Sequence, residues 1–339
     1  MPSDDSPHSI SLLTGVERRR IGVNGIVQGV GFRPFVFRLA SRFGIAGFVQ
    51  NDSTGVTIEI EGARPSLDEF LRVLQVELPP LARLTDLHVE SQPALGDTAF
   101  RIVTSSRHEI AGTLIAPDVA VCDDCLAELF DPQNRRYRYP FINCTNCGPR
   151  YTIVEQIPYD RPFTSMRVFP MCPECEREYH DPANRRFHAQ PNACPVCGPT
   201  VTWQAHRESV RGMDAIERAI AALTHGMTIA IRGLGGFHLA VDPRNENAVR
   251  TLRERKGRAE KPFALMARDM LSIEQYCHVS LDERKLLRQY TRPIVLLRAK
   301  QATALAESVA PGQEYLGFML PYTPLQHLLL RDHFDVSDT

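Results

Sequence analysis

Eight of the nine cysteines fall in four C-x2-C pairs, a spacing suited to metal ligation. The two pairs in residues 122–147 recur 50 residues later, so one motif, C-x2-C-x18-C-x2-C, occurs twice. Each C-x2-C turn places two thiolates on one side of a tetrahedral ion, and a second turn completes four sulfur ligands. The motif therefore predicts two structural Zn²⁺ sites, in which each repeat binds its own ion or the pairs interleave. The predicted ligands are Cys122, Cys125, Cys144, Cys147, Cys172, Cys175, Cys194 and Cys197.

Disulfides are the alternative for these cysteines, and the start of the chain argues against them. Residues 1–15 are polar and acidic without an apolar core, so we expect no secretory signal and a reducing, cytoplasmic location. Four thiolates leave no open coordination position, so the zinc is expected to stabilise the fold and not to catalyse. Cys277 stands outside the pairs and is predicted to be a buried structural thiol.

A second chemical motif is the glycine-rich turn 28–33, between a strand predicted over 21–27 and a helix in which Pro34 is the first residue. Two glycines at a helix N-terminus allow successive backbone N–H groups to converge on an anion. Arg33 adds a planar fork that binds phosphate oxygens bidentately. The predicted phosphate-binding residues are Gln28, Gly29, Val30, Gly31, Phe32 and Arg33.

This turn resembles the first signature of the acylphosphatase family, through Val23-x-Gly25-x-Val27-Gln28-Gly29-Val30-x-Phe32-Arg33. The run Gly47-Phe48-Val49-Gln50-Asn51-x3-Gly55 resembles most of the second signature, with a one-residue departure at Val56-Thr57 that bears on strand register. The resemblance implies two catalytic residues. Arg33 would bind the phosphoryl group, and Asn51 would orient the attacking water.

The elements around this turn predict a ferredoxin-like β-α-β-β-α-β domain. Strands are expected over 47–50 and 56–61, where polar and apolar residues alternate in the second run. The spacing Ser66-x-x-Glu69 predicts a capping box that opens the second helix. Further strand signal follows at 87–89 and 100–102.

The C-terminal segment carries a third motif, Lys256-x-Arg258-x-x-Lys261-Pro262, between a predicted helix and strand. Only four of the 39 basic residues are lysines, so two within six residues favour a specific role over a solvated charged face. The motif resembles the nucleotide-binding segment of YrdC-like domains, which make carbamoyl-adenylate from ATP with Mg²⁺. That family also uses a downstream Ser-x-Asn, which does not occur before residue 339, so we expect this domain to be incomplete.

The composition and charge of the chain argue against two classes of protein, those that bind nucleic acid and those that span a membrane. The 339 residues are 43% apolar and 23% charged with a formal net charge of −1, which is typical of a globular protein and does not favour binding to nucleic acid. No apolar run approaches the ~18 residues of a transmembrane helix, so no membrane partner is expected. Alternating helices and strands after residue 205, including a buried strand at 292–297, indicate an α/β domain.

The order of these parts resembles the HypF family of hydrogenase maturation carbamoyltransferases. The predicted fold class is α+β multidomain: a ferredoxin-like acylphosphatase domain (17–106), a duplicated zinc-finger segment (107–204) and a truncated YrdC-like α/β domain (205–339). The resemblance implies an enzyme that hydrolyses carbamoyl phosphate and uses ATP to form carbamoyl-adenylate. The carbamoyl group would then pass to the C-terminal cysteine of a HypE-type partner through a further domain absent here.

The sequence also leaves open a different class of protein, a zinc-finger binding module. Four C-x2-C pairs also resemble the DnaJ-type cysteine-rich region, which predicts a module that binds proteins or RNA. The arginine pairs 135/136 and 185/186 lie beside aromatic residues, as an RNA-binding surface requires, but they also suit structural roles such as capping carbonyls.

Overall fold

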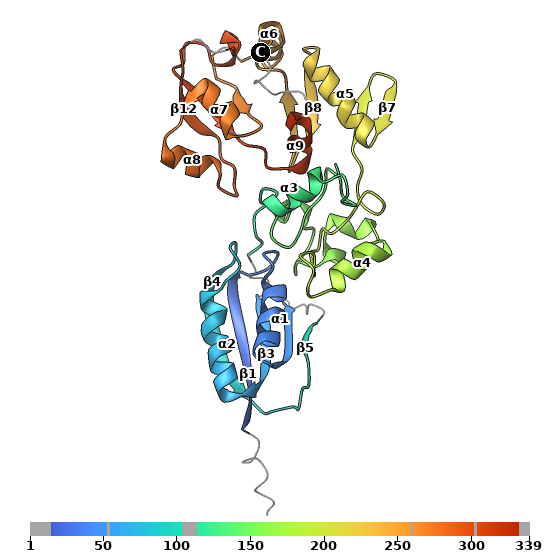
Figure 1. The fold of residues 1–339 in the computed structure, drawn as a ribbon, viewed down its shortest axis with the longest axis vertical. Coiled ribbons are helices and arrows are strands. Elements are labelled where there is room, and N and C mark those ends of the chain that lie inside the picture. Colours follow the sequence, from blue (N-terminus) through green and yellow to red (C-terminus); the bar gives the residue numbers. More distant parts are fainter. Residues whose placement is uncertain (1–14, 53–54, 104–113, 259, 302–303, 332–339) are drawn as a thin grey trace, which may run out of the picture. The chain divides into compact units, whose positions relative to one another are not determined.

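The computed structural model describes residues 15–52, 55–103, 114–258, 260–301 and 304–331, and most of the N-terminal segment used above to argue for location lies outside these ranges. The chain divides into two compact units (Figure 1). The first unit comprises residues 1–116, 153–168 and 176–190, and the second comprises 117–152, 169–175 and 191–339. Among the described residues, no helix is long and apolar enough to cross a membrane.

The first unit is built on a five-stranded sheet in the order β4-β1-β3-β2-β5. All neighbouring strands are antiparallel except β2 and β5. This arrangement confirms the predicted ferredoxin-like layout, and the strand signal at 100–102 corresponds to β5 at one edge. The strands are β1 (Val16–Ile26), β2 (Ala46–Asn51), β3 (Val56–Ala63), β4 (Arg83–Gln92) and β5 (Phe100–Ile102), and the helices are α1 (Phe32–Arg42) and α2 (Arg64–Val76).

Both helices pack on this sheet through apolar faces (Figure 1). The i, i+3, i+4 pattern of α1 buries Val36, Leu39 and Ala40. Val56 pairs with both Val23 and Asn51, so the departure at Val56-Thr57 leaves the strand register intact.

The start of α2 differs from the expectation. The helix begins at Arg64 after Ala63, no side chain caps its N-terminus, and Ser66 lies inside the first turn. Pro65 is tolerated there because first-turn N–H groups have no partner within the helix, so the helix extends past the predicted cap. The capping-box prediction at Ser66 was wrong. In α1, likewise, Pro34 is the third helical residue and Gly31 is the N-cap.

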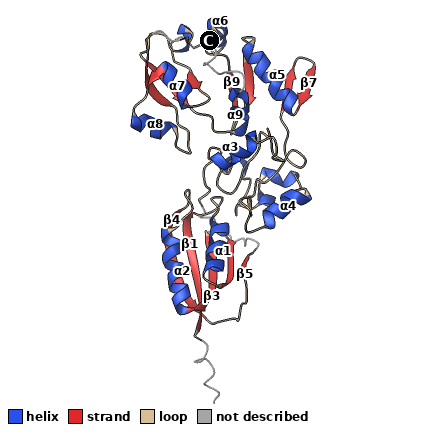
Figure 2. Ribbon diagram, in the orientation of Figure 1, coloured by secondary structure: helices blue, strands red, loops and turns tan. Residues whose placement is uncertain are grey.

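The cysteine-bearing segments consist mainly of loops (Figure 2). Their helices are α3 (Asp123–Phe130) and α4 (Pro173–His180), each of which begins within one residue of the first cysteine of its repeat. Three short 3-10 helices, Tyr151–Ile153, Arg161–Phe163 and Ser165–Val168, lie between the repeats.

The C-terminal part of the second unit alternates helices and strands, as predicted. Its four-stranded sheet has the order β10-β13-β12-β11, and two hairpins, β6–β7 and β8–β9, precede it in the chain. The elements are β6 (Thr202–Ala205), β7 (Glu208–Arg211), α5 (Met213–Thr224), β8 (Ile229–Arg232), β9 (Phe237–Ala240), α6 (Glu246–Arg255), β10 (Ala264–Met266), α7 (Met270–Tyr276), β11 (Cys277–His278), α8 (Leu281–Leu287), β12 (Val295–Ala299), β13 (Tyr315–Met319) and α9 (Pro324–Arg331).

Three local predictions can be checked in this unit. The capping box between Ser280 and Glu283 is present at the start of α8. Cys277 is 1% exposed, and burial raises the pKa of its thiol to about 11, consistent with a structural role. The strand expected to be fully buried is not: in β12 Leu297 is buried but Leu296 is 67% exposed, because alternate residues of a strand point to opposite faces and this sheet packs its core on one of them.

Candidate functional site

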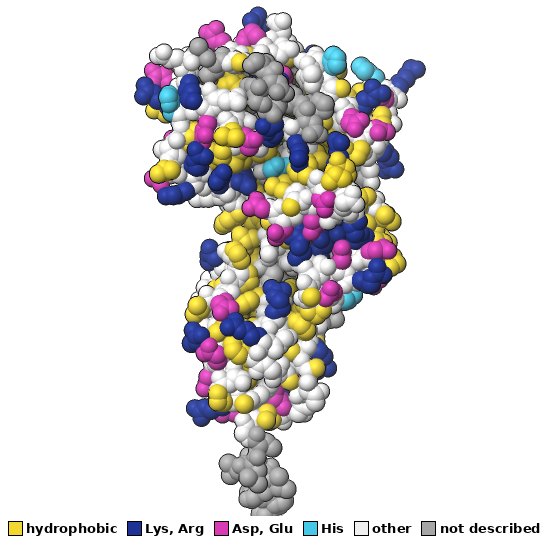
Figure 3. Space-filling view, viewed as in Figure 1, with side chains coloured by type: hydrophobic (Ala, Val, Ile, Leu, Met, Phe, Trp, Pro, Cys, Tyr) yellow, Lys and Arg dark blue, Asp and Glu magenta, His cyan; other side chains and the backbone are white. Residues whose placement is uncertain are grey.

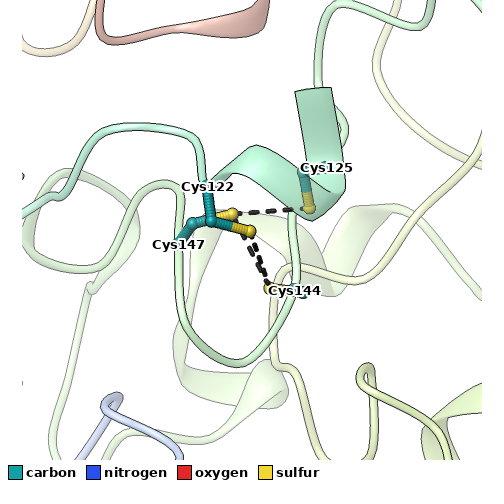
Figure 4. Close-up of side chains that lie close together, drawn as sticks. All are labelled: Cys122, Cys125, Cys144 and Cys147. Carbon is teal, nitrogen blue, oxygen red and sulfur yellow. Dashed lines mark hydrogen bonds between the residues drawn. The ribbon is translucent and has the colours of Figure 1, made fainter. Parts of the chain in front are cut away.

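The eight paired cysteines form two separate clusters, one from each repeat. In the first, Cys122 and Cys144 sulfurs are 3.7 Å apart, and Cys125 and Cys147 sulfurs are 3.5 Å apart (Figure 4). In the second, the Cys172–Cys194 and Cys175–Cys197 separations are 3.7 and 3.6 Å. A tetrahedron with Zn–S bonds of about 2.3 Å has edges of about 3.8 Å, so both clusters fit a zinc ion. Each repeat thus supplies a complete ligand set, and the interleaved pairing is excluded.

Buried arginines lie beside these clusters and donate to nearby backbone carbonyls. The sequence predicted such carbonyl capping only for the arginine pairs 135/136 and 185/186. Arg150, which it missed, is 2% exposed and donates to the carbonyl oxygens of Cys144 and Cys147 at 3.0 and 2.9 Å. Arg136, from the first repeat, donates to the Ala193 carbonyl (2.8 Å) and to the Cys175 sulfur (3.4 Å) of the second. The arginines cap carbonyls, as expected, and they also place positive charge beside the thiolates.

The glycine-rich turn lies between β1 and α1, as predicted. Gly29 and Gly31 adopt φ of 75° and 76°, left-handed values that side-chain-bearing residues rarely adopt, so both positions favour glycine. Val30 and Phe32 are each 1% exposed, and their side chains belong to the core. The turn leads directly into the positive end of the α1 dipole.

Arg33 and Asn51 lie together at this turn although 18 residues separate them in the chain. Both side chains are largely buried, with relative exposures of 7% and 1%. With its amide turned, Asn51 Oδ1 lies 3.3 Å from Arg33 Nε and 3.2 Å from Nη2. The two predicted catalytic residues therefore face one site.

Gln28 supports the site from beneath. Its amide nitrogen donates to the carbonyls of Asp52 and Gly55 at 2.8 and 2.7 Å, and its oxygen accepts the Tyr159 N–H at 2.9 Å. These bonds hold the Asn51 turn and a distant chain segment against the glycine loop, so the Gln28 side chain braces the site.

A segment that sequence reasoning missed completes this site. Tyr159 and Asp160, from the stretch between the two cysteine repeats, contact Arg33: Asp160 Oδ1 is 2.8 Å and the Tyr159 carbonyl 3.4 Å from Nη2. Beside them, burial and then the charge of Arg33 lower the pKa of His188 to about 3, which keeps this imidazole neutral. No local motif marks Asp160 as a site residue.

The third predicted site borders a cavity of about 570 Å³ in the C-terminal part of the second unit. Lys256 and Arg258 line it, whereas Lys261 is exposed and is not part of the described lining. Arg253, which sequence reasoning missed, is 8% exposed and donates to the carbonyls of Arg258 (3.3 Å) and Lys261 (3.2 Å). It thereby fixes the backbone that carries the lysine motif.

Charge over the surface is mixed. On the face drawn in Figure 3, basic and acidic side chains are interspersed, in keeping with the formal net charge of −1. This distribution does not resemble the basic stripe of a protein that tracks a nucleic-acid backbone.

Three family models match the chain. Residues 19–102 match the acylphosphatase model, and residues 121–154 and 171–204 match the HypF finger. Residues 221–336 match the Sua5/YciO/YrdC model, described as telomere recombination. An acylphosphatase from Thermotoga petrophila is 42% identical over 84 residues, which is 24% of this chain and 92% of that protein.

Relatives that match most of the chain are also known. Carbamoyltransferase HypF2 of Cupriavidus necator is 54% identical over 93% of this chain, and HypF of Synechocystis sp. is 49% identical over 92%. The chain spans only about two fifths of their length, 40% and 41%. A crystal structure of full-length HypF in a phosphate- and nucleotide-bound form superposes with a TM-score of 0.89 at 47% identity, covering 94% of this chain and 42% of that one. T. kodakarensis HypF gives 0.85 at 45% identity, covering 92% and 40%.

The fold and the sites define a class: an acylphosphatase domain joined to paired four-cysteine fingers and a Sua5/YrdC-like domain. The chain belongs to the HypF carbamoyltransferase family. The alternative of a DnaJ-like binding module is not supported, since the cysteines match the HypF finger and enzyme domains lie on both sides of it.

Proposed function

We propose that this chain hydrolyses carbamoyl phosphate at Arg33 and Asn51 and delivers carbamate for ATP-dependent adenylation in its Sua5/YrdC-like domain. The observation that carries the first step is the juxtaposition of Arg33 and Asn51 over a loop with two left-handed glycines. The enzyme class is therefore an acyl phosphate hydrolase within a carbamoyltransferase, and we place it in the cytoplasm, where the thiolates stay reduced.

The proposed hydrolysis relies on positioning and charge. Arg33 and the backbone amides of the glycine-rich turn hold the phosphoryl oxygens, and the N-terminus of α1 adds a favourable dipole. Asn51 holds a water in line with the phosphorus atom. The water oxygen bonds to phosphorus as the bond to the acyl oxygen breaks, so the products are phosphate and carbamate. An acyl phosphate is already activated, and such orientation suffices without a covalent intermediate.

For the second step, ATP is the proposed occupant of the cavity lined by Lys256 and Arg258; Lys261 follows them in the chain and is exposed. The cationic side chains of the lining, which also include Arg232, Arg244 and Arg268, suit the phosphates of a nucleotide, which would arrive with Mg²⁺. Carbamate would displace pyrophosphate from ATP to give carbamoyl-adenylate. The relatives are longer than this chain, which spans about two fifths of their length. We propose a HypE-type protein as the final acceptor, through its C-terminal cysteine.

The zinc ions have a structural part in this scheme. With four sulfurs each, the two clusters are coordinatively complete and supply folding free energy. Residues 153–168, which include Tyr159 and Asp160, lie between the two clusters in the chain.

Phosphate release from carbamoyl phosphate tests the first step. The zinc-loaded chain, without ATP or added metal, should release phosphate, and Arg33→Ala and Asn51→Ala should each lose about 100- to 1000-fold, the usual effect of removing a preorganised donor. Arg20→Ala, an exposed arginine of the same strand that leads to the turn, serves as the matched control. Full activity in Arg33→Ala would overturn the assignment.

The adenylation step has its own test. Carbamoyl-phosphate-dependent exchange between ATP and pyrophosphate should be weak with residues 1–339, because no Ser-x-Asn follows the lysine motif within them. Robust exchange would show that residues 205–339 are sufficient for adenylation and would contradict that expectation.

A further inference from the structure

The dipeptide Tyr159-Asp160 contacts both candidate catalytic side chains at once. Asp160 Oδ1 accepts from Arg33 Nη2 at 2.8 Å, and the Tyr159 carbonyl lies 3.4 Å from the same nitrogen. The same carbonyl lies 3.3 Å from the Asn51 side-chain atom that faces Arg33. A carboxylate thus bonds to the arginine proposed for phosphoryl oxygens, and a carbonyl oxygen lies beside the asparagine proposed to orient water.

The backbone on both sides of Asp160 is fastened in place. On one side the Tyr159 N–H donates to Gln28 Oε1 at 2.9 Å. On the other, Gln190, which is 1% exposed, accepts the Arg161 N–H at 2.7 Å and the Arg161 guanidinium on its carbonyl at 2.7 Å. The dipeptide is therefore held against the site by several buried hydrogen bonds.

The charges at this contact favour competition with phosphate. The Arg33 and Asp160 side chains are 8% and 15% exposed, so their opposite charges are poorly screened by solvent. His188, beside them, stays neutral and adds no second cation. An arriving phosphate therefore meets a paired arginine and a nearby negative carboxylate, which repels it. Carboxylate and phosphate oxygens are alternative partners for the same guanidinium N–H groups.

We propose that Asp160 is a built-in anionic competitor at the phosphatase site, which a phosphoryl group must displace from Arg33. This inference rests on the proposed phosphatase function. The exchange replaces one oxyanion by another and forms no covalent bond. It gives Asp160 two effects: it weakens the binding of inorganic phosphate, which assists product release, and it couples occupancy of the site to the segment between the zinc fingers.

Calorimetric titration of inorganic phosphate into the zinc-loaded chain tests this proposal. Asp160→Asn keeps an oxygen for Arg33 but removes the charge, and we expect phosphate to bind about 10- to 100-fold more tightly, with a matching fall in the inhibition constant for phosphate. Glu17→Gln removes an equivalent charge from the far end of β1 and should leave phosphate affinity unchanged. Asp160→Ala serves as the second variant and should change the affinity in the same direction.

Unchanged or weaker phosphate binding in both Asp160 variants would overturn the proposal. Weaker binding would assign Asp160 the opposite role, that of orienting Arg33 for the phosphate. The outcome is separable from the proposed function, because phosphate binding is measured without turnover. Wild-type chain that fails to hydrolyse acyl phosphates would refute the function while tighter phosphate binding in Asp160→Asn still supported the competitor.

Discussion

Replacement of Arg136 by methionine should selectively loosen the second zinc cluster. Arg136 is 1% exposed and donates to the Ala193 carbonyl at 2.8 Å, to Asn192 Oδ1 at 3.0 Å and to the Cys175 sulfur at 3.4 Å. Methionine fills much of the volume but leaves two buried oxygens without this donor, at about 1–3 kcal/mol each. It also removes a positive charge beside four thiolates. A loss of about 3 kcal/mol corresponds to a zinc affinity that is weaker by somewhat over a hundredfold, so a competing chelator takes this ion more readily.

Transfer of zinc to a chromogenic chelator measures this effect, and the protein contains its own control. The first cluster takes its ligands from Cys122 to Cys147 and should keep its wild-type release, so one zinc equivalent should leave early and the other late. Arg207→Met, a change at an exposed arginine, should leave both equivalents unaffected. Wild-type retention of both ions in Arg136→Met would refute the reasoning, and equal acceleration of both would indicate general destabilisation instead.

Two further predictions concern the other sites. Arg253→Met should weaken ATP binding about tenfold in a fluorescent-nucleotide titration, because the carbonyls of Arg258 and Lys261 lose a buried donor, at a cost of about 1–3 kcal/mol. Arg255→Met, a change at an exposed arginine, is the control. Unaltered ATP binding in Arg253→Met would contradict a role for Arg253 in fixing the loop. Burial lowers the pKa of His188 from 6.5 to about 3. The unfolded chain therefore binds a proton at this histidine below pH ~6.5, whereas the folded chain binds it only near pH 3. Stability should therefore fall as the pH drops through this window, and between pH 7 and 5.5 urea unfolding of the wild type should lose about 1 kcal/mol more than that of His188→Gln; equal losses would contradict the assignment.

Motifs that are contiguous in sequence were predictable with their chemistry. The C-x2-C pairs, the glycine turn and Arg33 could be recognised from residue type and spacing, because the geometry of each is set within a few residues. The pairing of the cysteines was not predictable, since the spacing satisfied both arrangements. It required the three-dimensional placement of Cys122–Cys147 and Cys172–Cys197.

Contacts between segments that are distant in the chain could not be predicted from the sequence. Asp160 lies 127 residues from Arg33, and nothing in its local sequence distinguishes it from a surface aspartate. The reach of Arg136 into the other repeat is similar, because a guanidinium on a long side chain can take a partner from any neighbouring segment. Local rules also compete: the capping pattern at Ser66 predicts a helix from residue 67, but the helix begins three residues earlier, at Arg64.

Hydrolysis of carbamoyl phosphate in ¹⁸O-labelled water, followed by ³¹P NMR, tests the central claim most directly. If Arg33 holds the phosphoryl group and Asn51 aims water at phosphorus, the chain without ATP should release phosphate carrying one solvent oxygen. The Arg33→Ala chain should release phosphate no faster than buffer. Unlabelled phosphate would mean that the C–O bond breaks and not the P–O bond. Labelled phosphate formed equally well without Arg33 would place the reaction elsewhere, and either result would contradict the account.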